Sequence, residues 1–179
     1  LLPILVLLPL LGALLVGLTP RDAVRAQRTI ALLATLATCA LGLYVCVEFD
    51  GASARAQHLF DAAWFTLPGS SGGIPVHVLL GLDGLSVLMV GLTALLGPIV
   101  VLSTENHIRE RVKEFMVWLL VMEAGMLGVF LALDVVLFYV FWETSLVPLY
   151  FIVGIWGGER RLYATIKFFL YTAFGSILM

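Results

Sequence analysis

Six apolar segments follow one another along the 179-residue chain and limit the folds open to it more than any other feature. Each is close to the roughly 20 residues that a helix needs to cross the hydrocarbon core of a bilayer. They lie near Leu1–Leu18, Ile30–Val47, Val78–Leu102, Phe115–Leu133, Val135–Ile155 and Leu162–Met179. Only 12% of the residues are charged, about half of the fraction usual in a soluble domain. We therefore predict an all-α fold, a polytopic transmembrane helix bundle that forms a single domain over residues 1–179.

The basic residues between these segments are unevenly distributed. If six spans alternate in direction, the first, third and fifth loops lie on one face of the membrane. These loops contain Arg21, Arg25, Arg28, Arg109, Arg111, Lys113, Arg160 and Arg161. The other face has Arg55 alone. Because loops rich in Arg and Lys stay in the cytoplasm, we predict that the N-terminus lies outside. The bases are divided among short loops, and we expect no nucleic-acid partner.

The second loop, residues 48–77, is the longest and is placed outside by the same pattern. Turn-forming residues concentrate in it: Gly51, Pro68, Gly69, Ser70, Ser71, Gly72, Gly73 and Pro75. Beside them, Trp64, Phe65, Ile74 and Val76 are residue types that favour strands. The loop is therefore compatible with a small hairpin at the membrane surface.

Three ionisable residues lie well inside the apolar segments: Glu123, Glu143 and Lys167. Such groups are costly in hydrocarbon unless they are paired, hydrated or neutral, and they often belong to ion or proton pathways. We interpret all three as candidates for a proton relay. The alternative for Glu123 is a neutral carboxyl buried by close helix packing at Gly125 and Gly128. The alternative for Lys167 is an ammonium group that extends back to the interface.

Glu123 and Glu143 are predicted to lie at the same depth. Glu123 precedes the tight turn at Asp134 by eleven residues and Glu143 follows it by nine. At 1.5 Å per residue, both lie roughly 13–17 Å from the outer edge, close to the bilayer centre. Two carboxyls on neighbouring helices repel each other if both ionise, so we expect at least one to hold a proton. A group that binds and releases a proton inside the bilayer is what a relay requires.

The sequence contains no motif for a cofactor or a metal. No glycine-rich loop has the pattern that cradles phosphate, and the His and Cys residues do not have the spacing of metal ligands. We expect neither a cofactor nor a metal ion in this chain.

Several motifs in the second half of the chain point to one family. Residues Phe141–Ile152 read FWETSLVPLYFI and are followed by WGG at 156–158. Further motifs are GLDGLS at 81–86, MEAG at 122–125, LALD at 131–134 and KFFLYT at 167–172. Together they resemble the antiporter-like membrane subunits of respiratory complex I (NADH-quinone oxidoreductase), in particular those of M type. The L-type sibling follows its Trp-Glu pair with a different sequence.

This resemblance implies a larger antiporter-like fold made of two inverted helix repeats, without a redox cofactor. It implies that the subunit moves protons, driven by quinone reduction elsewhere in the complex, beside L-type and N-type antiporter-like subunits in the lipid bilayer. In the family, the glutamate that matches Glu143 pairs with a lysine on the seventh span. The sequence ends at Met179, inside the sixth segment, so we expect the C-terminal remainder of the subunit, with that lysine, to lie outside it.

We therefore predict a proton-translocating membrane-arm subunit of NADH:quinone oxidoreductase, an enzyme in which this chain performs no redox chemistry. Its composition, rich in Ala and Arg, suggests the inner membrane of a bacterium. One alternative is a subunit of a multisubunit cation/proton antiporter, or of the membrane arm of an energy-converting hydrogenase. Another is a structural scaffold whose buried acids are inert.

Overall fold

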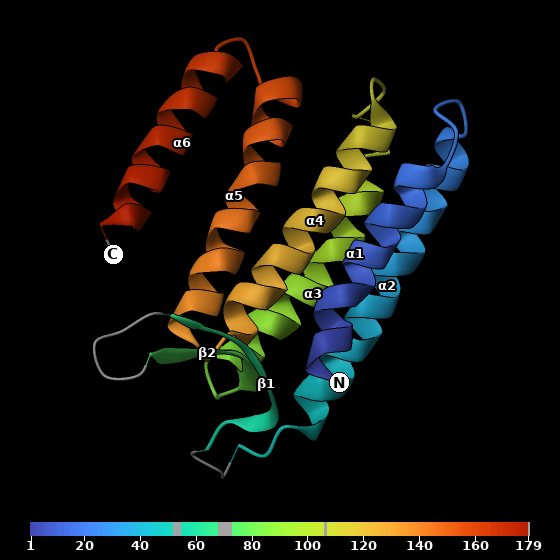
Figure 1. Ribbon diagram of the computed structural model, residues 1–179. Helices are drawn as coiled ribbons and strands as arrows, with labels where there is room; N and C mark the ends of the chain where they lie inside the picture. The colour runs from blue at the N-terminus through green and yellow to red at the C-terminus, as the bar shows by residue number, and fades with distance from the viewer. Residues whose placement is uncertain (52–54, 68–72, 106, 179) are drawn as a thin grey trace.

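The computed structural model describes residues 1–51, 55–67, 73–105 and 107–178. In order along the chain, its elements are α1 (Leu2–Leu18), α2 (Val24–Glu48), β1 (Gln57–Leu67), β2 (Ile74–Leu82), α3 (Ser86–Ser103), α4 (Val112–Leu131), α5 (Val135–Trp156) and α6 (Arg161–Ile177). The helices lie side by side (Figure 1). The turns α1–α2, α3–α4 and α5–α6 are at one end, and the two strands and the α4–α5 turn are at the other (Figure 1).

Four of the described helices, α2, α3, α4 and α5, are long and apolar enough to cross a membrane. Helix α1 is also apolar but has 17 residues. Helix α6 has 17 residues as well and includes the charged Arg161 and Lys167. The prediction of a mostly helical membrane bundle is therefore confirmed. Six complete spans and an outside N-terminus stay predictions.

Helices α1 to α4 pack together, α5 packs on α4, and α6 packs on α5 (Figure 1). The contact between α4 and α5 depends on small residues. A Cβ added at Gly125 would lie 3.1 Å from the Cβ of Ser145, and one added at Gly128 would lie 2.6 Å from Cε1 of Phe141. Glycines allow two helix backbones to approach closely, which helps helices to associate where lipid offers no hydrophobic driving force. The predicted close packing at Gly125 and Gly128 is thus confirmed.

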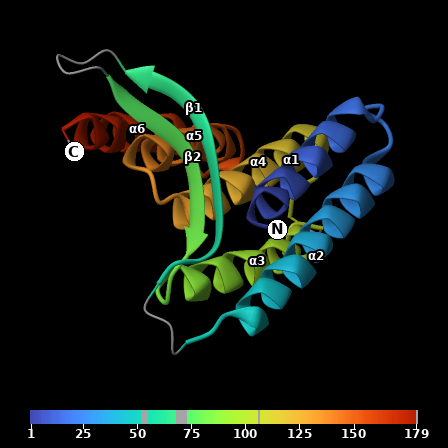
Figure 2. The same ribbon diagram turned by 60° about the horizontal axis from the view of Figure 1, so that its bottom comes forward.

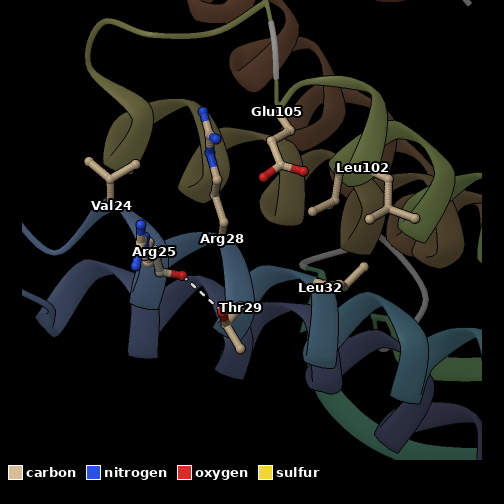
Figure 3. A pocket seen from close by; sticks show the side chains of 8 residues that line it. Val24, Arg25, Arg28, Thr29, Leu32, Leu102 and Glu105 are labelled. Atoms are coloured by element: carbon tan, nitrogen blue, oxygen red, sulfur yellow. Dashed lines mark hydrogen bonds between the residues drawn. The ribbon is translucent and has the colours of Figure 1, made fainter.

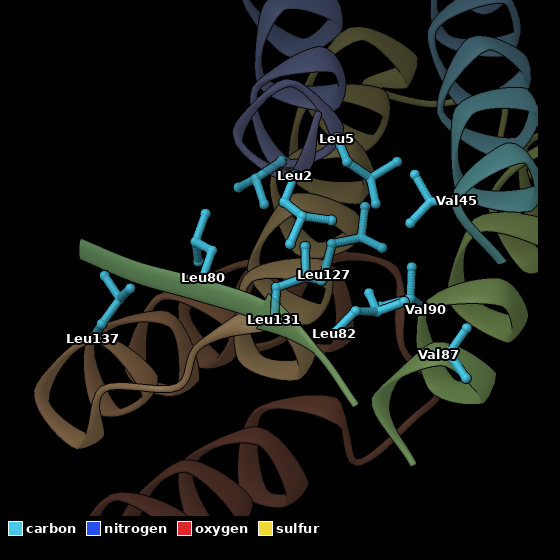
Figure 4. Packing of buried hydrophobic residues seen from close by; sticks show 11 residues of the cluster. Leu2, Leu5, Val45, Leu80, Leu82, Val87, Val90, Leu127, Leu131 and Leu137 are labelled. Atoms are coloured by element: carbon cyan, nitrogen blue, oxygen red, sulfur yellow. The ribbon is translucent and has the colours of Figure 1, made fainter. Parts of the chain in front are cut away.

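The loop between α2 and α3 contains an antiparallel hairpin, β1–β2, which extends across the ends of the helices (Figure 2). It is longer than the small hairpin that the sequence suggested. The backbone of β2 is joined to the α4–α5 turn, because Leu133 N donates to Leu79 O at 2.9 Å. Leu80 and Leu82 are buried against residues of the helices such as Leu131 (Figure 4). The predicted turn residues Pro68, Gly69, Ser70, Ser71 and Gly72 lie outside the described residues.

The predicted start of the third span near Val78 is wrong, because residues 78–82 belong to β2 and α3 begins at Ser86. These strand residues are buried or half-buried. A strand buried on both faces has a continuous apolar sequence, and periodicity alone does not separate it from a helix. The second helix also begins earlier than predicted, at Val24 instead of near Ile30. Its first turns include Arg25 and Arg28, whose long side chains can extend from a helix toward polar groups.

Asp83 and Ser86 hold the start of α3 through reciprocal hydrogen bonds. Oδ1 of Asp83 accepts from Ser86 N at 2.7 Å and from Leu85 N at 3.0 Å, and Ser86 Oγ accepts from Asp83 N at 2.8 Å. This arrangement is a capping box. The hydrogen bonds from Ser86, first of all that from its backbone N–H, lower the pKa of the Asp83 carboxyl below its ordinary value because they favour the charged form.

We expect Asp83→Ala to lower the free energy of unfolding by about 1 kcal/mol at neutral pH, the usual cost of a lost cap. The lowered pKa of Asp83 means that its contribution is complete above the unfolded-state pKa of about 3.9 and is lost as pH falls through the folded-state value. Thermal unfolding in detergent at a series of decreasing pH values checks this. The difference between wild type and variant should shrink in acid, and a difference that grows there would contradict the prediction.

Candidate functional site

Glu143 lies in the middle of α5 on the side that faces α6. It is half-buried and follows the first residue of α5 by eight positions. Its Oε1 accepts a hydrogen bond from the hydroxyl of Ser176, a residue of α6 with only 7% of its surface exposed. A carboxyl at this depth therefore has a polar partner on the neighbouring helix.

Glu123, on α4, is more deeply buried, with 4% of its surface exposed. Neither carboxyl oxygen has a hydrogen-bond partner among the described residues. The carboxyl lies against Gly97 of α3, where an added Cβ would be 3.0 Å from Cδ of Glu123. It also lines a pocket of about 300 Å³ between α3 and α4, whose other walls, such as Leu92 and Met126, are almost entirely apolar. Because an unpaired ion is costly in such a site, this environment suits a carboxyl that holds its proton.

The two glutamates share a depth but face different neighbours. Glu123 precedes the end of α4 by eight residues, and Glu143 follows the start of α5 by eight, so each is about 12 Å from the turn. Residues two apart are separated by roughly 200° around a helix. Gly125 of α4 faces α5, so Glu123, two residues earlier, points away from α5. Ser145 of α5 faces α4, so Glu143 points away from α4. The expected repulsion between neighbouring carboxyls is therefore not a feature of this arrangement.

Lys167 is exposed on α6 and lies apart from both glutamates. Its Nζ is 5.7 Å from the ring centre of Tyr163 and 5.9 Å from that of Tyr171. Aromatic faces attract a cation at these distances. Lys167 precedes Ser176 by nine residues, or about 13 Å along the helix. The structure does not bring Lys167 into contact with Glu143.

Ser176 is a residue of the candidate site that the sequence reasoning missed. A signal for it was present, because α5 and α6 are antiparallel and joined by a short turn. Glu143 precedes the end of α5 at Trp156 by 13 residues, and Ser176 follows the start of α6 at Arg161 by 15. Counting from the turn therefore places the two side chains at similar depth.

The basic residues of the first, third and fifth loops gather at the end of the bundle opposite the hairpin (Figure 1). A pocket of about 570 Å³ there is lined by Arg25, Arg28 and Glu105 among others (Figure 3). Arg28 donates to Ile108 O at 2.8 Å, which connects α2 to the α3–α4 loop. A second pocket of about 550 Å³, with further Arg and Lys residues, lies at the same end.

Within the described parts of the chain, no group of three or more His, Cys, Asp or Glu residues is placed to hold a metal ion. Of the histidines, His77 contacts Asp61 on the hairpin at 2.6 Å, and His58 approaches Glu48 at 3.9 Å. Both are at the hairpin end of the molecule and far along the chain from Glu143.

Comparison with known proteins gives consistent matches. The family model for the transmembrane region of NADH:quinone oxidoreductase and Mrp antiporters matches residues 132–179. Subunit M of the NADH-quinone oxidoreductase of Rhodobacter capsulatus is 44% identical over 183 residues, which cover 100% of this chain and 34% of that protein. Subunit M of the F420H2 dehydrogenase of Methanosarcina mazei is 38% identical and covers 98% of this chain and 34% of its own length.

A solved structure, respiratory complex I from Thermus thermophilus with bound NADH, matches with a TM-score of 0.79 and 32% identity. The match covers 98% of this chain and 33% of that one. The chain therefore spans about a third of the length of the relatives that it matches.

Proposed function

The chain belongs to the family of antiporter-like membrane subunits that includes subunit M of NADH-quinone oxidoreductase, and on this premise we propose that it is part of a proton-translocating membrane-arm subunit. The enzyme would be the whole NADH:quinone oxidoreductase. This chain would perform no redox chemistry and would carry protons, with quinone reduction elsewhere supplying the energy.

The observation that carries the proposal is the contact between Glu143 and Ser176 across α5 and α6. A carboxyl in the middle of a membrane helix is costly unless it is paired, hydrated or neutral, and such groups often belong to ion or proton pathways. Here it has a hydroxyl partner that can accept or donate a hydrogen bond. Glu143 is therefore suited to receive a proton and to release it without leaving its place.

The proposed relay depends less on Glu123 and Lys167 than on Glu143. Glu123, buried against Gly97, could hold a proton on the α3 side of the bundle. Lys167 lies too far along α6 from Ser176 for direct transfer to Glu143, so a step between them needs water or another side chain. Glu143 is the residue on which the proposal depends most.

For the membrane topology, we propose six spans with the N-terminus outside. The basic end of the bundle would then lie in the cytoplasm, as loops rich in Arg and Lys do. Bacterial relatives support a location in a bacterial inner membrane. By the same relationship, the partners of the subunit would be the L-type and N-type antiporter-like subunits and the lipid around them.

A second candidate function is cation/proton exchange. The family model that matches residues 132–179, the part of the chain that contains Glu143 and Ser176, describes Mrp antiporters as well as quinone oxidoreductases. A carboxyl that binds a proton suits either activity. The two differ in what drives the proton: electron transfer in one and a cation gradient in the other.

Inverted membrane vesicles that contain the full-length subunit in its complex distinguish the candidates. We expect NADH to drive proton uptake and a sodium or potassium gradient, without NADH, to drive none. Proton movement driven by the cation gradient alone would replace the proposal with an antiporter. Normal NADH-driven proton uptake in the same vesicles with Glu143→Gln would instead indicate a structural scaffold.

A further inference from the structure

The hydroxyl of Ser176 has two acceptors within reach. One is Oε1 of Glu143 on α5. The other is the carbonyl oxygen of Ala173, one turn earlier on α6, at 2.9 Å. A serine hydroxyl has a single hydrogen, so it can donate to only one of them at a time. Which oxygen accepts this hydrogen depends on whether Glu143 is ionised or protonated.

With Glu143 ionised, the hydroxyl donates to the carboxylate, because hydrogen bonds to a charged acceptor are the stronger ones. When Glu143 takes up a proton, its new O–H can donate to Ser176 Oγ. The serine then turns its own hydrogen to Ala173 O. Each protonation adds one proton to the carboxyl, the O–H bond of the serine does not break, and both polar groups keep a partner in both states.

We propose that Ser176 is a positioning residue that holds the Glu143 carboxyl in both of its protonation states by reversing the direction of their hydrogen bond. The inference rests on the proposed function, since it requires Glu143 to gain and lose a proton during turnover. Because the same contact serves both states, protonation needs only a rotation of the hydroxyl and no movement of α5 against α6.

Neighbouring hydroxyls do not have this geometry. Thr144 donates to Val140 O and Ser145 to Trp142 O, each at 2.7 Å and each within α5. Thr172, one turn before Ser176, donates to the carbonyl of Phe168 at 2.9 Å within α6. Among the described residues, Ser176 is thus the hydroxyl that reaches Glu143. Thr172 provides a matched control, because its removal deletes a hydroxyl from the same helix without touching the carboxyl.

The test uses the intact complex with Ser176→Ala, Ser176→Thr and Thr172→Ala. We expect NADH-driven proton uptake to fall by roughly tenfold in Ser176→Ala, as for the loss of one hydrogen bond to a charged group. Ser176→Thr should restore most of it, and Thr172→Ala should leave it unchanged. If Ser176→Ala reduces assembly, Ser176→Cys keeps nearly the same shape with a weaker donor and should give a smaller loss.

Infrared difference spectra separate positioning from simple packing. The carboxyl C=O band of protonated Glu143, identified by its absence in Glu143→Gln, should move to higher wavenumber in Ser176→Ala and return in Ser176→Thr. An unmoved band in Ser176→Ala, or equal loss of uptake in the Ala and Thr variants, would overturn the inference. Normal uptake in Glu143→Gln would instead overturn the proposed function, while a moved band would still show the contact.

Discussion

Replacement of Glu143 by Gln is expected to abolish NADH-driven proton uptake while the complex still assembles. A Gln side chain has nearly the same shape, and its amide oxygen can still accept the hydrogen bond from Ser176. What it lacks is a group that binds and releases a proton. We expect uptake to fall by roughly 100-fold or more, the range for a side chain that must transfer a proton. Vesicles that report proton uptake and NADH oxidation together measure both effects.

Glu159→Gln is the matched control for this experiment, because it removes the same charge from an exposed residue of the α5–α6 turn. We expect it to pump as wild type does. Glu123→Gln should be milder than Glu143→Gln, since Glu123 lies on the other side of the α4–α5 contact. Normal pumping in Glu143→Gln would make this residue a buried structural acid and would remove the central step of the proposed relay.

A substitution of Gly128 by Ala is expected to destabilise the contact between α4 and α5. The added Cβ would lie 2.6 Å from Cε1 of Phe141 and nearer still to other atoms of the ring. Because the ring belongs to a packed interface, either the ring or the helix has to move, and overpacking of this kind costs about 1–3 kcal/mol. Thermal unfolding of the purified complex, together with the yield of assembled complex, measures the loss.

Two further variants identify the cause of that loss. Gly17→Ala adds the same methyl group to α1, where no atom lies within 4 Å of the new Cβ, and it should be neutral or slightly stabilising. Phe141→Leu in the Gly128→Ala background should recover part of the stability, because the smaller side chain leaves room for the methyl group. If the effects of Gly128→Ala and Phe141→Leu on stability are additive, the predicted clash is wrong.

The helices could be predicted from the sequence because each one is an apolar run near the length that a membrane requires. The boundary between β2 and α3 could not, since Val78–Leu82 is as apolar as the helix that follows. Tertiary contacts determine the secondary structure of this segment, because β2 is held by its pairing with β1 and by the hydrogen bond between Leu133 N and Leu79 O.

The depth of the two glutamates was also predictable, because it follows from counting residues on either side of one turn. Their direction was predictable in principle. Gly125 and Gly128 identify the face of α4 that meets α5, and Glu123 lies opposite to Gly125. The prediction of repulsion used only their common depth on neighbouring helices and not the face on which each carboxyl lies. The surroundings of Lys167 could not be predicted, because they depend on which face of α6 meets α5 and which stays exposed.

The hydrogen bond that joins the hairpin to the α4–α5 turn has a mechanical consequence. It holds the hairpin end of α5 near Leu133, so we expect a tilt of α5 against α4 to pivot at this end of the helix. Counted from the first residue of α5, Glu143 is about 12 Å along the helix and Trp156 about 31 Å, so the carboxyl moves less than half as far as the far end of the helix. The short turn to α6 lies at that far end of α5. When α5 tilts, this turn therefore moves farther than the Glu143 carboxyl. Large displacements of the α5–α6 turn are thereby reduced to small changes in position at the proton-binding group.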